Sequence, residues 1–237
     1  MTASAAPPCK AILLDMNGVF MFGQDRFGPA EDYFATYQAQ GGGRLTHPEV
    51  QHAIDAVHAQ LAADYANTAR HDDYPSVAEV MARLVDAPAA ELAALERVFA
   101  AHELGAVPPD YAACLHRLAA VAPLGIVSNI WALKDPWLDH LDAVGVGGLW
   151  RTRVFSSDSR SMKPSPALFH RALTDLTAHD PSLTPADVLF IGDTLGADIL
   201  PAKSLGMATA WVGPKATAHP AADRVAGSLL ELEGALA

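Results

Sequence analysis

Side chains that can bind metal ions or phosphate stand at the ends of apolar runs, or just ahead of a helix-like segment, at four separated places in this sequence. In chain order they are Asp15, Ser128 with Asn129, Lys163, and Asp193 followed by Asp198. Carboxylate oxygens are ligands that Mg²⁺ prefers, and water and substrate phosphate usually complete its coordination. Serine and asparagine offer short donors for phosphate oxygens, and a lysine supplies a point charge against a nucleophile. Together these residue types predict phosphoryl-transfer chemistry.

Each of these residues also has an ordinary structural interpretation. An aspartate after an apolar run can cap a turn or a helix, a Ser-Asn pair can form a turn, and a lone lysine is commonly solvated. Their occurrence in one order, each at a strand end or a helix entry, favours the functional interpretation. Ligands of open α/β sheets bind outside the carboxyl ends of the strands, and all four places are predicted to meet there.

The elements that must position these residues are those of an α/β fold with a Rossmann-like parallel sheet. Four apolar runs are typical of buried parallel strands: residues 11–14, 124–127, 188–191 and 207–212. A weaker fifth run is found at 153–155. Segments with helical patterning lie between most of them, and Ser165 with Pro166 supplies an N-cap and a first-turn proline for one such helix. After the last run we expect a loop and a short C-terminal helix.

The interval after the first strand departs from this alternation. From about residue 22 to residue 107 the sequence has helical patterning without a good strand candidate, and Ser76 with Glu79 forms a capping box ahead of one helix. An all-helical insert at this point predicts a cap over the ligand-binding edge of the sheet. The predicted division is a helical cap domain at 22–108 and a core domain at 1–21 and 109–237.

Composition is typical of a globular protein, with 51% hydrophobic and 18% charged residues in 237. A net charge of -11 argues against a general nucleic-acid surface, although a local cation can still attract an anionic substrate. No apolar stretch approaches the roughly 20 residues that cross a bilayer, so no membrane partner is expected. Residues 1–8 lack the features of a secretory signal and are expected to be a disordered lead-in. Two cysteines make no disulfide framework, which favours the reducing cytoplasm.

The four motifs ILLDMNGV, GIVSN, MKPSPALF and FIGDTLGADI together resemble the haloacid dehalogenase superfamily, in its subfamily I with a helical C1-type cap. This resemblance implies Mg²⁺ and an aspartyl-phosphate intermediate at Asp15. It also implies that Ser128 binds phosphate and that Lys163 neutralises charge around it. Asp193 would ligate the metal, with Asp198 nearby as a direct or outer ligand.

Asn17 departs from the pattern of this family. Family phosphatases have an aspartate there, which protonates the leaving oxygen and then accepts a proton from the hydrolytic water. An amide can do neither, whereas the main-chain carbonyl of Asn17, a metal ligand in the family, is unaffected. General acid–base catalysis contributes roughly 10²–10⁴-fold, a large loss for an alkyl phosphate and a small one when the leaving group departs without a proton.

Three functions follow from this departure. The first is a Mg²⁺-dependent phosphatase or phosphotransferase acting on a small phosphorylated metabolite, slow on ordinary monoesters or restricted to acyl and aryl phosphates. The second is a dehalogenase-like hydrolase of carbon–halogen bonds, because halide departure needs no general acid. Family dehalogenases are metal-free and lack the Gly-Asp pair, so Asp193 counts against it. The third is a non-catalytic member that binds metal or phosphate.

Other polar and aromatic residues have weaker signals. Trp131 could line the mouth of the site, but packing is the favoured interpretation for it and for Trp137. The segment 71–73, His-Asp-Asp, superficially suggests a metal site and is interpreted as a solvated turn. The predicted cap also contains basic residues that could meet an anionic tail but are expected to be solvated: Arg26, Arg44, His47 and Arg70.

Overall fold

The structure is a computed structural model that describes residues 9–234. The lead-in predicted at residues 1–8 lies outside the described residues. A six-stranded sheet forms the centre, in the order β3-β2-β1-β4-β5-β6, and every neighbouring pair is parallel. Its strands are β1 (Ala11–Leu14), β2 (Leu124–Ser128), β3 (Trp150–Phe155), β4 (Val188–Gly192), β5 (Ala208–Val212) and β6 (Arg224–Ala226). The predicted Rossmann-like parallel sheet is confirmed.

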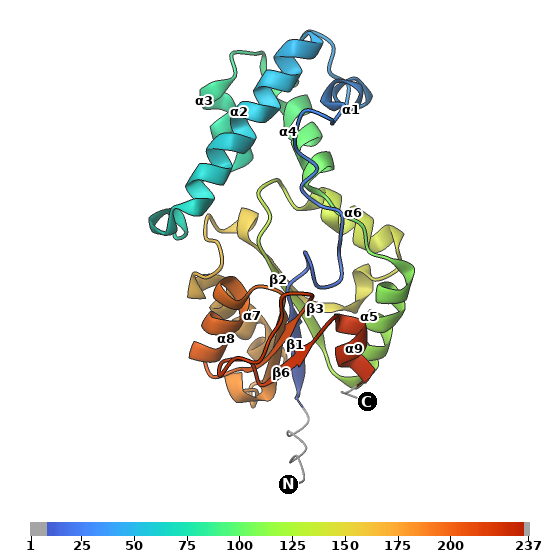
Figure 1. Cartoon of the computed structure of the whole chain (residues 1–237), viewed down its shortest axis with the longest axis vertical. Coiled ribbons are helices and arrows are strands. Elements are labelled where there is room, and N and C mark those ends of the chain that lie inside the picture. The colour runs from blue at the N-terminus through green and yellow to red at the C-terminus, as the bar shows by residue number, and fades with distance from the viewer. Residues whose placement is uncertain (1–8, 235–237) are drawn as a thin grey trace.

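Helices cover both faces of this sheet (Figure 1). They are α5 (Pro109–Val121), α6 (Asp135–Ala143), α7 (Pro166–His179), α8 (Leu200–Ser204) and α9 (Leu229–Gly234). Successive residues of β1 point to opposite faces, because side chains alternate along a strand. Ala11 and Leu13 pack in the hydrophobic cluster that contains α7, whereas Ile12 and Leu14 pack in the cluster that contains α5, α6 and α9. Burial on both faces explains why these strands are continuous apolar runs.

Two details of the sheet differ from the sequence expectation. β3 is longer than the weak run at 153–155, and β6 occupies part of the stretch expected to be a loop. β6 has only three residues and pairs with β5. Its conformation is therefore decided by this tertiary pairing, and no local sequence pattern predicts it. The prediction of a loop at this point was therefore wrong, and the short C-terminal helix that follows is confirmed as α9.

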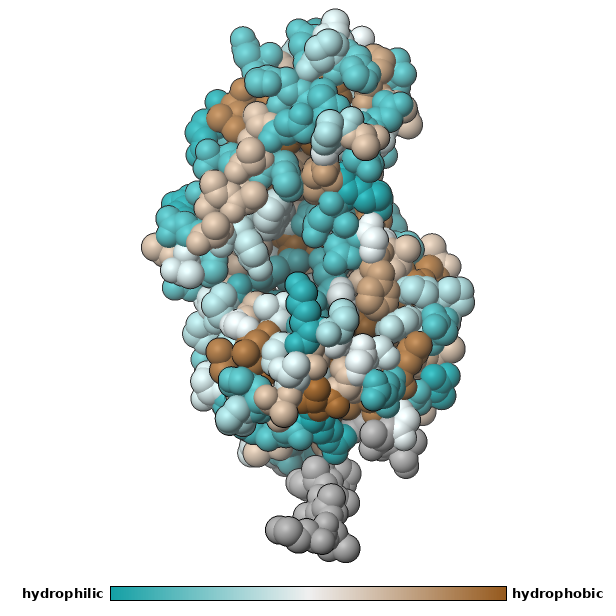
Figure 2. Space-filling view, in the orientation of Figure 1, coloured by the Kyte–Doolittle hydropathy of each residue, from teal (hydrophilic) through white to brown (hydrophobic). Residues whose placement is uncertain are grey.

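Four helices follow β1 and pack on one another beyond the carboxyl ends of the strands (Figure 1). They are α1 (Tyr33–Ala39), α2 (His47–Ala66), α3 (Val77–Leu84) and α4 (Ala89–Glu103). The capping box is confirmed, since the Glu79 amide donates to Ser76 Oγ at 3.2 Å and the Ser76 amide donates to Glu79 Oε2 at 2.9 Å. We propose that this helical block is the cap domain expected at 22–108. Between it and the sheet the molecular surface is hollowed (Figure 2).

No helix within residues 9–234 combines the length and the apolar character that crossing a membrane requires.

Candidate active site

Asp15 lies directly after β1, the strand between β2 and β4, and is buried at the carboxyl edge of the sheet. Its Oδ1 accepts a hydrogen bond from Ser128 Oγ at 2.7 Å and forms an ion pair with Lys163 Nζ at 2.8 Å. Within the described chain its Oδ2 accepts no hydrogen bond. One carboxylate oxygen is therefore held, and the other is left with its electron pairs unused, as a nucleophile requires.

Lys163 is only 2% exposed and lies between two carboxylates. Its Nζ contacts Asp198 Oδ1 at 2.6 Å as well as Asp15 Oδ1 at 2.8 Å. Burial by itself would lower the pKa of this lysine, but the charges of Asp15 and Asp198 more than offset burial and raise the pKa. The ammonium therefore stays charged at neutral pH beside the predicted nucleophile.

The side chains of Asp198 and Asn129 both bind Lys163 and hold it in position. Asp198 sits in the turn η5 (Leu195–Ile199); it pairs with the lysine through Oδ1 and accepts from the Thr194 amide through Oδ2, at 3.0 Å. The Asn129 side chain donates to the Lys163 carbonyl at 3.0 Å and accepts from the Lys163 amide at 2.8 Å. This pair of bonds joins the end of β2 to the loop that carries the lysine, so the amide predicted to bind phosphate is engaged in positioning that loop.

Asp193 completes a cluster of acids at this edge. Carboxylate oxygens of Asp15, Asp193 and Asp198 lie within 4.8 Å of one another. Burial, and then the nearby charge of Asp15, raise the pKa of Asp193. The Asp193 carboxylate lies so close to Gly18 that a side-chain carbon at that glycine would collide with it. Gly18 also has a φ of +75°, which favours glycine.

Charge balance shows what this cluster can hold. Three carboxylates face the one ammonium of Lys163, so the group carries more negative than positive charge. An all-oxygen donor set with excess negative charge suits a hard divalent cation that keeps several waters. Asp15 and Asp193 fit this use best, because Lys163 and the Thr194 amide already engage both oxygens of Asp198.

Asn17 lies two residues beyond Asp15 and lines the same cavity. Its Oδ1 is buried and has no hydrogen-bond partner in the described part of the chain. A buried acceptor without a donor loses roughly 1–3 kcal/mol of free energy, so this atom is expected to accept from a bound water or substrate group. The amide can orient such a donor, but it has no carboxyl proton to give.

The cavity has a volume of about 410 Å³, and every residue of the predicted site except Ser128 lines it. Its remaining wall includes residues that no sequence motif contains, which we call the cap-side wall. They are Gln24, Asp25, His58, Tyr65, Glu103 and Trp131. Trp131 therefore lines the site and also packs against cap aromatics, whereas Trp137 is wholly buried in the core, as expected.

Glu103 is a carboxylate that the sequence analysis missed. It is the last residue of α4 and is 3% exposed, and its Oε1 and Oε2 accept from the amides of Trp131 at 2.6 Å and Ala132 at 2.8 Å. Burial raises its pKa to about 8, against the opposing effect of these two hydrogen bonds. A signal did exist, because Glu103 stands four residues after Phe99 and continues the apolar stripe of that helix.

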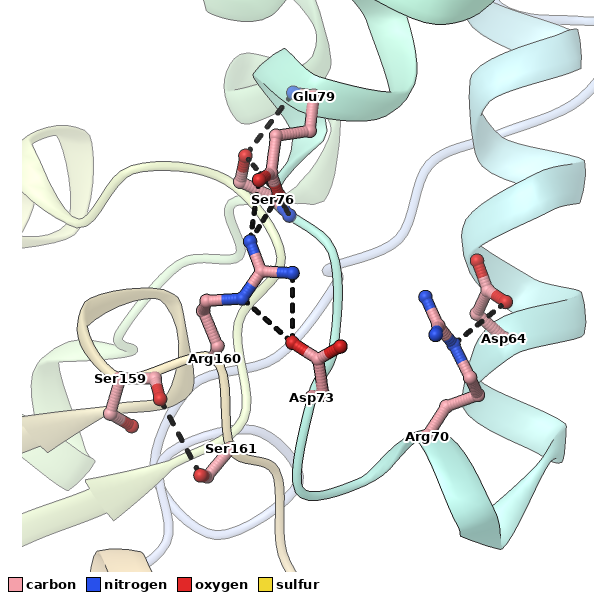
Figure 3. A network of polar contacts seen from close by, with 8 residues as sticks. All are labelled: Asp64, Arg70, Asp73, Ser76, Glu79, Ser159, Arg160 and Ser161. Carbon is pink, nitrogen blue, oxygen red and sulfur yellow. Dashed lines mark hydrogen bonds and ion pairs between the residues drawn. The ribbon is translucent and has the colours of Figure 1, made fainter.

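A second set of contacts joins the helical block to the loop before Lys163 (Figure 3). Arg160 Nε donates to Asp73 Oδ1 at 2.9 Å, and its NH1 donates to both carboxylate oxygens of Glu79 at 2.5 and 2.6 Å. Main-chain bonds run alongside, from the Tyr74 amide to the Arg160 carbonyl at 2.7 Å and from the Met162 amide to the His71 carbonyl at 2.8 Å. The segment interpreted as a solvated turn is thus where the helical block docks.

The basic residues considered as contacts for an anionic tail do not line the cavity. Arg26 donates to the carbonyls of Gly23, Ala101 and Leu104. It thereby joins the segment that leads into the helical block to the end of α4, where the chain leaves that block. The others are engaged within the helical block: Arg44 with Glu91, Arg70 with Asp64 and the His47 ring beside Phe34.

The structure brings together a carboxylate after the central strand of a parallel sheet, a lysine held by acids and a helical block inserted after the first strand. This arrangement is similar to the one that the resemblance to the haloacid dehalogenase superfamily implies. Residues 161–232 match a family model described as HAD-hydrolase-like, where HAD stands for haloacid dehalogenase. A comparison with curated proteins gives no match.

Solved structures with this fold include both phosphatases and dehalogenases. A HAD phosphatase from Thermococcus onnurineus is 20% identical, with 96% of this chain and 97% of that chain covered and a TM-score of 0.59. A 2-haloacid dehalogenase from Pseudomonas syringae is also 20% identical, with 96% and 98% covered and a TM-score of 0.63. A HAD-hydrolase from Bacillus subtilis, solved bound to magnesium, is 16% identical, with 96% and 98% covered and a TM-score of 0.56. The family model over residues 161–232 supports the resemblance to the haloacid dehalogenase superfamily, and these structures show that the fold is shared.

Proposed function

We propose that this protein is a Mg²⁺-dependent phosphatase or phosphotransferase that acts on a small molecule whose phosphate has a good leaving group. The observation that carries the proposal is the arrangement around Asp15, with one oxygen held by Ser128 and Lys163 and the second acid, Asp193, beside it. Neither a membrane nor a nucleic acid is needed as a partner. The two unpaired cysteines, Cys9 and Cys114, support the cytoplasm as its compartment.

In the proposed reaction, the free oxygen of Asp15 attacks phosphorus, and the bond from phosphorus to the leaving oxygen breaks with its electron pair staying on that oxygen. Lys163 stabilises the negative charge near the transferring group, while Asp198 and Asn129 hold the lysine in place. A Mg²⁺ ion held by Asp15, the Asn17 carbonyl and Asp193 would neutralise phosphate charge. Water then attacks the phosphorus of the aspartyl-phosphate, and Asp15 leaves as a free carboxylate.

Asn17 limits which leaving groups can depart. The amide cannot protonate the leaving oxygen, so the oxygen must be stable as an anion, as in an acyl phosphate or an aryl phosphate. The unpartnered Oδ1 of Asn17 can accept a hydrogen bond from the attacking water and orient it. The proton of that water then goes to a phosphate oxygen or to solvent.

Hydrolysis of a carbon–halogen bond is the second candidate. The absence of a carboxyl group at Asn17 favours it, because a halide leaves without a proton. The acid at Asp193 favours the phosphatase, because a dehalogenase needs no metal and Asp193 would only add negative charge beside Asp15.

The test is the activity of wild type and Asn17→Asp on a matched pair, 4-nitrophenyl phosphate and a simple alkyl phosphate, each with Mg²⁺. We expect wild type to hydrolyse the aryl ester, and Asn17→Asp to raise kcat on the alkyl ester by up to about 10²–10⁴-fold while changing the aryl rate little. Asp15→Asn, as control, should abolish both. Chloride release from 2-chloropropionate without metal, together with no turnover of aryl or acyl phosphates, would replace the proposal by the second candidate.

A further inference from the structure

We propose that the cap-side wall binds the leaving group of the substrate, and that this group is a flat aromatic ring carrying a positive charge, as in the phosphate ester of a phenolic amine. The proposal rests on the proposed function and names the substrate class of that site. It is argued from three properties of the wall: its aromatic rings, its charges and the place of the nearest arginine.

Aromatic rings form a fixed surface on this side of the cavity. The Trp131 ring lies with its centroid 5.7 Å from that of His58 and 6.0 Å from that of Tyr65, and all three residues line the cavity. Behind them Tyr74 and Phe99 have centroids 6.2 and 6.3 Å from that of Trp131. Rings supported in this way offer π faces to a flat group, and the negative face of a tryptophan attracts cations.

The titratable side chains of the cap-side wall are mostly acids. Asp25 and Glu103 both line the cavity, and within residues 9–234 neither forms an ion pair. Burial lowers the pKa of His58, so its imidazole is neutral at pH 7. Among the described residues that line the cavity, Lys163 is the one lysine or arginine, and two carboxylates already hold it. An anionic tail would find no cation here, whereas an ammonium group would find two acids, and its charge would favour the ionised form of Glu103, whose proton passes to solvent on binding.

Arg26, the arginine that follows Asp25 in the sequence, does not line the cavity and so offers no positive charge to an anionic group there. Arg26 directly follows Asp25, yet its guanidinium donates to the carbonyls of Gly23, Ala101 and Leu104. The residue adjacent in the chain that could have neutralised the wall is thereby committed to main-chain bonds.

Glu103 supplies the strongest reason for a bound cation. Ionised Glu103, 3% exposed and with two main-chain donors but no counter-ion, loses much of its hydration without regaining the energy of an ion pair, and for this reason its pKa is raised to about 8. A substrate ammonium in the cavity would supply the missing counter-ion. Because the two amides come from Trp131 and Ala132, the same carboxylate also holds the tryptophan in place for the ring of the substrate.

Three aryl phosphates with nearly the same leaving group test this proposal. They are O-phosphotyramine, 4-propylphenyl phosphate and 3-(4-phosphonooxyphenyl)propanoate, whose tails are positive, neutral and negative. We expect kcat/KM to fall in that order and to differ at least tenfold between the first ester and the last. The difference should arise from KM, with kcat nearly the same for all three. Glu103→Gln and Asp25→Asn should each reduce the difference, and Asp86→Asn, an exposed residue outside the cavity, should leave it unchanged.

Binding of the products separates this proposal from the proposed function. Calorimetry should show tyramine binding to wild type more tightly than 4-propylphenol, and Glu103→Gln should remove the preference. Equal kcat/KM for the three esters would overturn the charged subsite and leave the phosphatase intact. No turnover of any ester, with tyramine still bound preferentially through Glu103, would overturn the phosphatase and leave the subsite. If Glu103→Gln fails to fold, Asp25→Asn at the exposed mouth decides the matter by the same measurements.

Discussion

Replacing Glu103 by glutamine is expected to change the stability of the protein in opposite directions at low and at high pH. The residue is buried, and burial raises the pKa of its carboxyl group from 4.5 to about 8 in the folded protein. Between these two pH values the folded protein holds a proton that the unfolded chain has lost. Wild-type stability therefore falls as pH rises through this window, and a glutamine, which does not titrate, removes that fall.

The magnitude follows from the pKa difference. Each pKa unit corresponds to about 1.4 kcal/mol, so keeping Glu103 protonated at pH 7 lowers the free energy of unfolding by about 3 kcal/mol, and at pH 5 by less than about 1 kcal/mol. In the variant, one of the amides of Trp131 and Ala132 faces the NH₂ group of the glutamine and loses its acceptor, which costs about 1–3 kcal/mol at every pH. We expect Glu103→Gln to destabilise at pH 5 by about 1–2 kcal/mol and to be neutral or stabilising at pH 7 and above.

Urea denaturation of wild type and variant at pH 5, 6, 7 and 8 measures this difference, and titrations common to both proteins cancel in it. The free energy of unfolding of Glu103→Gln minus that of wild type should rise by up to about 1.4 kcal/mol per pH unit between pH 5 and 7, and by less between pH 7 and 8, where Glu103 begins to titrate in the folded protein. Asp86→Asn, which changes an exposed acid, should give a difference that stays flat. A flat difference for Glu103→Gln as well would refute the reasoning, since Glu103 would then titrate alike in the folded and unfolded chain.

Three further changes test the site and its closure. Lys163→Met should lower the free energy of unfolding by about 3–5 kcal/mol in urea melts, because it leaves buried Asp198 without its partner; unchanged stability would mean that the pair is not formed. Asp193→Asn should abolish Mg²⁺ binding in calorimetry while the urea midpoint holds, and retained Mg²⁺ affinity would remove Asp193 from the predicted metal site. Arg160→Ala should raise KM by less than roughly fivefold, because exposed ion pairs contribute little. High salt screens these ion pairs and should raise the KM of wild type towards that of the variant. A change in kcat without a change in KM would contradict a role of Arg160 in docking the helical block.

How far the site could be predicted from the sequence depends on which element carries each residue. Asp15, Ser128 and Asp193 end strands whose burial fixes them at one edge of the sheet, so an apolar run followed by a polar residue is enough to find them. Glu103 and Asp25 belong to the helical block and its linker, where packing of helices decides what faces the cavity. Periodicity gives the helices but not the angle at which they cross, so these residues could not be assigned to the site.

Roles of individual residues were harder to predict than their positions. Asn129 was expected to bind phosphate, yet both ends of its amide are bound to the main chain of Lys163, across a sequence separation that no local pattern encodes. Trp131 was assigned to packing in preference to the site, and it does both, because the aromatic cluster behind it is also the wall of the cavity.

The amide at Asn17 and the aromatic wall are independent features, one a single position in a motif and the other the product of how the helical block folds. Both favour the same leaving group, because a phenolate departs without a proton and its ring can stack on Trp131. Two substrates separate their contributions. A non-aromatic acyl phosphate has a leaving group that departs without a proton but no ring to stack on the wall. It should therefore combine a high kcat with a high KM. An aromatic alkyl phosphate, such as a benzyl ester, satisfies the wall alone and should combine a low KM with a low kcat, which Asn17→Asp raises. The same kcat for both substrates would mean that proton transfer does not limit the reaction, and Asn17 would then have no part in the choice of leaving group.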